Sequence, residues 1–143
     1  MCNIVFENND RVICKSMSKV VTLNTSLIRY MDSLCVLSGT TYEDNIKSTR
    51  KLMNNINKTP LYFSILNDYL IPLGRLSEGG CFWFSAKEFL SCFEKDGATY
   101  LKFKDKMIIS CEFSKFSIMK QYSKYVELDK IRKEKMRQYG FNL

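Results

Sequence analysis

The chain has 143 residues, of which 45% are hydrophobic and 13% aromatic. That length and apolar share are enough for a buried core and argue against a disordered chain. The chain carries 22 basic and 15 acidic residues, and its net charge of +7 favours polyanionic partners. It has no apolar run approaching the roughly 20 residues of a membrane span, and its first residues, MCNIVFENND, lack the pattern of a signal peptide. We therefore expect a cytoplasmic protein without a membrane partner.

The residue types for common catalytic sites are poorly represented. The sequence has no histidine, which excludes Ser-His and Cys-His nucleophile pairs and an imidazole acid or base. Cysteines are scattered through apolar segments without a C-x-x-C pair, as expected of small buried hydrophobes: they are Cys2, Cys14, Cys35, Cys81, Cys92 and Cys111. We expect no enzyme activity, no metal, no disulfide and no cofactor.

The first third of the chain favours short strands that lead into a helix. Four brief apolar runs predict antiparallel strands at residues 11–16, 19–23, 27–30 and 34–37. Gly39 allows a sharp turn after the last of these runs. Thr41, followed three residues later by Asp44, approximates a capping box, so a helix is expected to begin near Tyr42.

The expected helix at about residues 42–55 is amphipathic. One side repeats at steps of three and four and should face a core: it carries Tyr42, Ile46, Thr49, Met53 and Ile56. Another side carries Lys47, Arg50, Lys51 and Asn54. Pro60 biases Thr59 away from helical geometry and ends the unit. The basic side is compatible with a solvated surface or with contact to a polyanion.

Beyond Pro60 the pattern predicts two hairpins and a central strand. Residues 61–66 and 69–73 flank the turn Asn67-Asp68, and residues 99–113 alternate around Asp105-Lys106. A flexible loop at residues 75–80 precedes an almost wholly apolar strand at 81–85, and residues 86–93 predict a short helix. We interpret Trp83 as a core or subunit-contact residue rather than as a platform for base stacking. If Tyr100 and Phe103 lay on an exposed sheet, they would allow an RNA-binding alternative.

The carboxyl-terminal part is predicted to be a basic helical tail at about residues 115–143. Apolar residues recur at threes and fours from Phe116, and a second, sparser helical segment follows at 128–136. The tail carries eight cations and three anions, so most of the net charge lies there. Together these elements predict an α+β fold: a small antiparallel β-rich core, one amphipathic helix and a C-terminal helical segment within a single domain, residues 1–143.

An ordered series of short motifs resembles the ComK family of bacterial competence transcription factors. The motifs are Ser33-Leu34-Cys35, Gly39-Thr40-Thr41-Tyr42-Glu43, Ser48-Thr49-Arg50-Lys51-Leu52, Lys58-Thr59-Pro60-Leu61 and Cys81-Phe82-Trp83-Phe84. The corresponding family patterns are S-C, G-S-S-Y-E-G-R, G-T-K-K-L, K-x-P-I and C-x-W-I. The likeness runs in order from about Arg11 to about Leu128. In one departure, Asp44-Asn45 stands where the family pattern has Gly-Arg.

The resemblance implies a transcription activator that binds AT-rich double-stranded DNA through the minor groove as a homo-oligomer. It also implies a role in DNA uptake and turnover through a proteolytic adaptor. The DNA-binding candidates are Lys47, Arg50, Lys51, Asn54 and Lys58. We assign the lysines and Arg50 to phosphates, with Arg50 or Asn54 as a groove reader, and the helix start near Thr41 as a further phosphate site.

The departure at Asp44-Asn45, together with a shortened amino-terminal part, leaves an alternative open. In it the protein is a ComK-like interaction module that has lost DNA binding and modulates another regulator. One continuous basic patch would favour DNA. Dispersed lysines beside an apolar surface patch would favour a protein partner.

Overall fold

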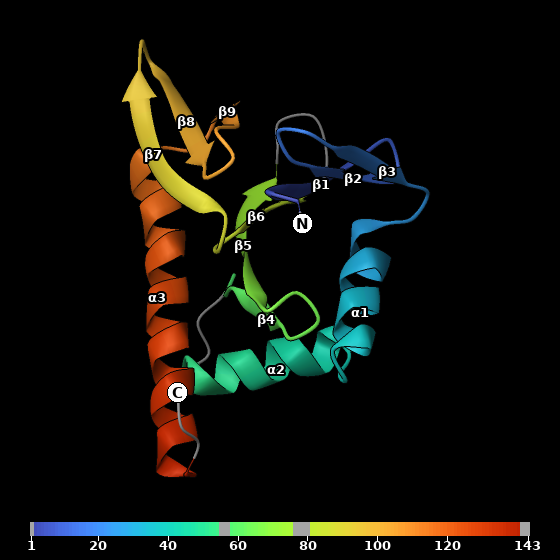
Figure 1. Ribbon diagram of the computed structural model, residues 1–143, viewed down its shortest axis with the longest axis vertical. Coiled ribbons are helices and arrows are strands. Elements are labelled where there is room, and N and C mark those ends of the chain that lie inside the picture. Colours follow the sequence, from blue (N-terminus) through green and yellow to red (C-terminus); the bar gives the residue numbers. More distant parts are fainter. Residues whose placement is uncertain (1, 55–57, 76–80, 141–143) are drawn as a thin grey trace.

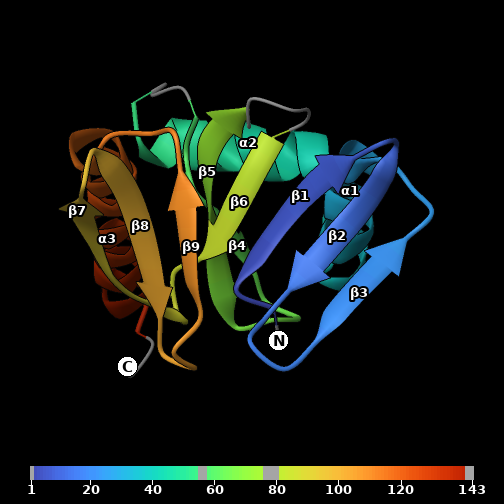
Figure 2. The same ribbon diagram turned by 90° about the horizontal axis from the view of Figure 1, so that it is seen from above.

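The computed structural model describes residues 2–54, 58–75 and 81–140 and has an α+β fold with two antiparallel sheets (Figure 1). The larger sheet has the order β3-β2-β1-β6-β5-β4, and the smaller one has the order β7-β8-β9. Figure 2 shows the smaller sheet beside the larger one, on the side where α3 lies. The predicted fold class, with its antiparallel β-rich core, is confirmed.

The larger sheet consists of β1 (Ile4–Asn8), β2 (Arg11–Lys15), β3 (Val20–Leu23), β4 (Leu61–Phe63), β5 (Asp68–Arg75) and β6 (Cys81–Ser85). The smaller sheet consists of β7 (Phe89–Lys95), β8 (Ala98–Phe103) and β9 (Ile108–Cys111). The helices are α1 (Leu27–Leu37), α2 (Tyr42–Leu52) and α3 (Lys115–Gln138). The strands predicted at 11–16 and 19–23 and both predicted hairpins are confirmed, although β4 is shorter than expected.

The central strand β6 divides the core into two parts. Phe82 and Phe84 belong to a cluster that includes residues of α3 and of the smaller sheet. Trp83, between them, belongs to a second cluster with residues of α1. Successive side chains of a strand point to opposite faces, so β6 is covered on both. In Figure 1, α1 and α3 accordingly lie on opposite sides of β5 and β6. The predictions of a central strand and of a core tryptophan are confirmed.

The strands predicted at 27–30 and 34–37 are wrong, because both runs lie within the single helix α1. The hydroxyl oxygen of Ser26 caps it by accepting a hydrogen bond from the backbone nitrogen of Arg29 at 3.3 Å. Leu27, Met31 and Cys35 are its buried residues. Their spacing of four forms one helical stripe, which disappears when the segment is read as two short runs.

The short helix predicted at 86–93 is also wrong, since the structure has the strand β7 there. Its buried residues Phe89 and Cys92 are three positions apart, a spacing that looks helical. The strand changes register against β8 between Phe89 and Ser91. A bulge of this kind inserts an extra residue and breaks the period of two.

The predicted carboxyl-terminal segments form one continuous helix, α3, of 24 residues. Ser114 caps it and accepts a hydrogen bond from the backbone nitrogen of Ser117 at 3.1 Å. Ile118, Gln121 and Leu128 are its buried residues. The helix packs on β5 and β7, so the tail is part of the fold over most of its length.

Some expectations fall on residues outside the described ranges. They concern the end of the predicted helix at residue 55, Ile56, and most of the loop at 75–80. Within the described ranges, Cys14, Cys35 and Cys92 are buried, as expected of small core hydrophobes. None of the described helices has the length and apolar character needed to cross a membrane.

Candidate nucleic-acid interface

Helix α2 begins as its sequence predicts. The hydroxyl oxygen of Thr41 accepts a hydrogen bond from the backbone nitrogen of Asp44 at 3.1 Å. The backbone nitrogen of Tyr42 donates to the carboxylate of Asp32 at 2.9 Å. Two amides of the helix start are thus already bonded, and Glu43 and Asp44 add negative charge to the first turn. Both facts disfavour the predicted phosphate site at this helix start.

The inner side of α2 packs on the core, as its periodicity predicts. Thr49 and Met53 are buried, and Ile46 is half-buried. The side-chain amide of Asn45 donates to the backbone carbonyl of Tyr62 at 3.1 Å and thereby ties α2 to β4. The position where the ComK pattern has arginine therefore serves helix packing in this chain.

The outer side of α2 presents the predicted candidates to solvent. Lys47, Arg50, Lys51 and Asn54 are all exposed. Lys47 forms an ion pair with Glu43 at 3.1 Å, and an exposed pair of this kind is weak and easily exchanged for another anion. Asn54 has a φ of 55° and follows the C-cap, so it also ends the helix in the left-handed conformation that asparagine tolerates.

Arg50 and Lys58 line one groove of about 230 Å³, whose other walls include Pro72 and Trp83. The ammonium group of Lys58 lies near Gly74, because a Cβ placed on that glycine would be 3.8 Å from Nζ. Gly74 has a φ of 99° at the point where β5 shifts register against β6. The irregularity in β5 therefore lies directly beside the lysine.

A buried polar side chain fixes Lys58 against α3. The amide Nε2 of Gln121 donates to the backbone carbonyl of Lys58 at 2.9 Å and to that of Pro72 at 2.6 Å. These two bonds join the chain before β4 to β5 and to the helix. They determine which residues of α3 lie next to Lys58.

Two lysines of α3 complete a group with Lys58. The pKa of Lys124 lies below its ordinary value because the side chain is partly buried and because the charges of Lys120 and Lys58 repel its charged form. We call Lys58, Lys120 and Lys124 the basic cluster. Sequence reasoning assigned the two α3 lysines only to the tail. One sequence feature could have indicated their position. Gln121, between these two lysines, is a polar residue on the apolar side of the helix, and a buried amide there needs a hydrogen-bond partner from another segment.

Other cations of α3 serve the fold. The guanidinium carbon of Arg132 lies 3.8 Å from the ring centre of Tyr62, and its Nη1 donates to the hydroxyl of Tyr69 at 2.7 Å. Lys133 forms an ion pair with Asp129 at 2.8 Å. The cations of the predicted basic tail therefore differ in their surroundings: Lys120 and Lys124 belong to the basic cluster, Arg132 and Lys133 contact other side chains of the fold, and Lys115, Lys130, Lys135 and Arg137 are exposed.

The aromatic candidates do not form a stacking surface. Phe103 is fully buried and Trp83 is 7% exposed. Tyr100 stacks on Phe93 with ring centres 5.2 Å apart. The RNA-binding alternative required Phe103 to face solvent, and its burial contradicts that alternative.

The described residues thus form an α+β protein in which Arg50 of α2 shares a groove with Lys58, whose charge acts on Lys124 of α3. Residues 3–137 match the family model described as ComK protein, so the chain belongs to the ComK family. It is a competence-transcription-factor-like protein. The match confirms the resemblance of the motif series and extends it nearer to both ends. No curated protein and no solved structure matches the chain.

Proposed function

We propose that this protein is a transcription regulator that binds AT-rich double-stranded DNA with the outer side of α2 and the basic cluster. The observation that carries the proposal is the meeting of two distant parts of the chain: Arg50 and Lys58 line one groove, and the charge of Lys58 acts on Lys124 of α3. Crowded like charges disfavour the free protein, and a phosphate backbone relieves their repulsion while it releases counterions. A helix face that only serves solubility needs no such convergence.

The residues have distinct roles in this proposal. Lys47, Lys51 and the basic cluster contact phosphates, which fixes the register of the protein on the duplex. Arg50 and Asn54, at the end of α2, read the groove. The narrow minor groove of AT-rich DNA has an enhanced negative potential that attracts an arginine.

The proposal includes self-association on neighbouring DNA sites. Val36 and Leu37 at the end of α1 are exposed by 57% and 67%, and Ile65 by 53%. The backbone nitrogen of Ile65 donates to the hydroxyl of Ser38 at 3.2 Å, which brings these apolar side chains into one region. Apolar groups of this kind support contact with a second copy.

The remaining parts of the proposal rest on family membership. We propose that residues 1–143 form a single domain, and that the protein acts in the cytoplasm as an activator of genes for DNA uptake. We also propose that its turnover passes through a proteolytic adaptor. Both core clusters draw residues from β5 and β6, which supports the single domain.

Charge-removal variants test the DNA surface. We expect Arg50→Ala to weaken binding to a labelled AT-rich duplex by about 1–3 kcal/mol if the guanidinium reads a base edge. The double variant Lys58→Ala/Lys124→Ala removes two phosphate contacts, so the slope of log affinity against log salt should become shallower by about 2. Fluorescence anisotropy at several salt concentrations measures both effects.

The matched control is Lys19→Ala/Lys95→Ala, which also removes two charges. Both lysines are exposed, one before β3 and one at the end of β7. The control should retain most of the affinity and of the salt slope. Equal losses in the two double variants would show that net charge alone, rather than this surface, drives binding.

Asn45 supports a second candidate function, the ComK-like interaction module without DNA binding. Its inward-facing amide occupies the position where the ComK pattern has arginine, so one cation of that pattern is missing here. This candidate predicts no binding to either AT-rich or GC-rich DNA at low salt. It also predicts stable capture of another regulator, which a pull-down followed by a purified binding assay measures.

A further inference from the structure

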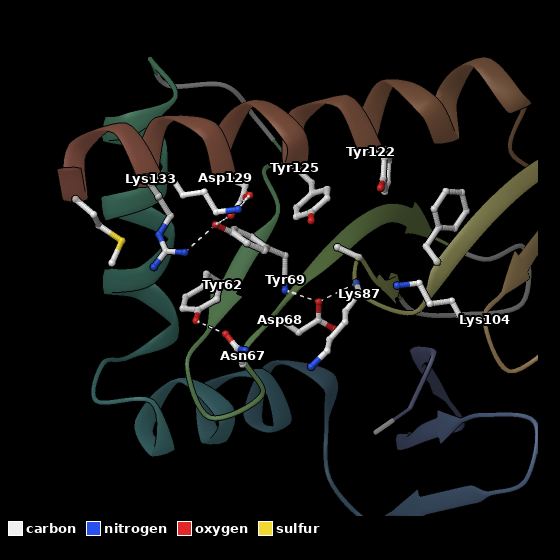
Figure 3. A pocket seen from close by; sticks show the side chains of 14 residues that line it. Tyr62, Asn67, Asp68, Tyr69, Lys87, Lys104, Tyr122, Tyr125, Asp129 and Lys133 are labelled. Carbon is white, nitrogen blue, oxygen red and sulfur yellow. Dashed lines mark hydrogen bonds and ion pairs between the residues drawn. The ribbon is translucent and has the colours of Figure 1, made fainter. Parts of the chain in front are cut away.

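A second cavity follows a different side of α3 from the basic cluster. It has a volume of about 700 Å³ and lies between this helix, the start of β5 and the turns at residues 86–88 and 104–106. Figure 3 shows four tyrosines and several cations around it. We call it the tyrosine pocket. The proposed DNA contacts use none of its lining residues, so it needs an explanation of its own.

One wall of the tyrosine pocket is aromatic. The ring centres of Tyr62 and Tyr69 are 5.0 Å apart, those of Tyr69 and Tyr125 are 4.9 Å apart, and those of Tyr122 and Tyr125 are 5.3 Å apart. Tyr62, Tyr122 and Tyr125 are only half-buried. The four rings therefore form a continuous wall that still presents aromatic surface to the cavity.

The cations at one end of the pocket are already compensated. Arg132 stacks on Tyr62 and donates to the hydroxyl of Tyr69, and that hydroxyl donates to Asp129 at 3.0 Å. Asp129 also pairs with Lys133. These contacts hold the aromatic wall in place, and they pair the charges of Arg132, Asp129 and Lys133 with groups of the protein itself.

The other end presents two exposed lysines, Lys87 and Lys104. Neither forms an ion pair within the described part of the chain. The nearby carboxylate of Asp68 is buried, and it accepts hydrogen bonds from the hydroxyl of Ser85 and from the backbone nitrogens of Tyr69 and Lys87. Its oxygens are thus used by the fold. Burial raises the pKa of Asp68, and the charge of Lys87 acts on this carboxylate and opposes that effect. An anion in the pocket would therefore meet Lys104 directly and share Lys87 with Asp68.

An aromatic wall in a cavity that two exposed lysines also line matches a ligand with a flat ring and one anionic group. Ring stacking on tyrosine and charge-assisted hydrogen bonds to lysine act together on such a molecule. The volume lies within the range of small-molecule sites. We propose that the tyrosine pocket binds a small aromatic anion, with its ring against Tyr122 and Tyr125 and its phosphate or carboxylate at Lys87 and Lys104.

Two probes distinguish the sources of the anionic group. Adenosine 5′-monophosphate supplies a ring with a phosphate, and 4-hydroxybenzoate supplies a ring with a carboxylate. Titration calorimetry on the full chain should show saturable binding of at least one of them. Adenosine lacks the phosphate and inorganic phosphate lacks the ring. Each should bind at least about tenfold more weakly than adenosine 5′-monophosphate, because each loses a stacking or charged contact.

Variants and amide shifts in a ¹⁵N spectrum locate the site. We expect the affinity for whichever probe binds to fall about tenfold in Lys87→Ala/Lys104→Ala. The control Lys58→Ala/Lys124→Ala, which removes the same charge at the proposed DNA surface, should bind it as wild type does. In the wild-type protein the probe should shift the amide signals of Lys87, Lys104 and Tyr125.

Several results would overturn the proposal. They are the absence of saturable binding of both probes at millimolar concentration, adenosine binding as tightly as its monophosphate, and equal effects of the two double variants. Amide shifts confined to residues outside the pocket would also overturn it, whatever the variants show. None of these results bears on DNA binding, which the control variant reports separately.

Discussion

Gln121 of α3 donates a hydrogen bond from its side-chain amide to the backbone carbonyl of Lys58 at 2.9 Å. The same amide donates to Pro72, so one buried side chain joins α3 to β5 and to the segment before β4. Lys58 is thereby held beside Lys124, whose pKa its charge helps to lower. The geometry of the basic cluster thus depends on an uncharged residue.

Replacing that residue should affect stability and DNA binding together. Gln121→Leu leaves two carbonyls without their donor, which should lower the free energy of unfolding by about 1–3 kcal/mol. Loss of the tether should also weaken DNA binding by roughly 0.5–2 kcal/mol. Denaturant unfolding and anisotropy measure the two effects. The control Gln138→Leu, at an exposed position of the same helix, should change neither. Full DNA affinity in a destabilised Gln121→Leu protein would contradict the tether.

Arg132 is a cation of the tail that should matter for the fold only. Arg132→Met removes its contact with the Tyr62 ring and its hydrogen bond to Tyr69. We expect the free energy of unfolding to fall by about 1–2 kcal/mol and DNA affinity to change little. Arg137→Met, at an exposed position, should change stability by less than about 0.5 kcal/mol. If Arg132→Met lost much DNA affinity at unchanged stability, the DNA-binding surface would have to extend along α3 to Arg132.

Asn54 has a backbone role and a proposed contact role, which glycine separates. Asn54→Gly preserves the positive φ, so the free energy of unfolding should change by less than about 0.5 kcal/mol. DNA binding should weaken by about 1–3 kcal/mol if the amide reads a base edge. Asn9→Gly is the matched control, because Asn9 is exposed and has a φ of 50° in the β1–β2 turn. Equal affinities of the two variants would remove Asn54 from the interface.

The lowered pKa of Lys124 gives DNA binding a pH dependence. As pH rises through this lowered pKa the free protein loses the proton, whereas bound phosphate favours the charged form. Binding in that range must take up a proton, so affinity should fall as pH approaches the ordinary lysine pKa of 10.5 from below. Lys124→Gln should show a flatter dependence in the same anisotropy titration. An identical slope in both proteins would assign the effect to other groups.

The sequence predicts α2 well because three local signals agree: the cap at Thr41, the apolar stripe and the stop before Pro60. Sequence-based prediction fails for segments whose secondary structure is determined by tertiary contacts. The two runs within α1 looked like strands because each is too short to display the spacing of Leu27, Met31 and Cys35. The bulge in β7 gave a strand the spacing of a helix, and only its pairing with β8 reveals the difference.

The candidate site shows the same limit. The exposed cations of α2 were predicted from the periodicity of a single helix, as was the exposure of Asn54. The basic cluster joins residues from two distant segments, and the link through Gln121 is a tertiary contact with no local pattern. The packing role of Arg132 likewise depends on Tyr62 and Tyr69, which lie on other elements.

The most direct test compares wild-type binding to a labelled AT-rich duplex and to a GC-rich duplex of equal length, by fluorescence anisotropy at two salt concentrations. DNA recognition by Arg50 and the basic cluster predicts tighter binding to the AT-rich duplex and a loss of affinity as salt increases. Absence of binding to both duplexes at low salt would contradict the proposed function and favour the protein-interaction module.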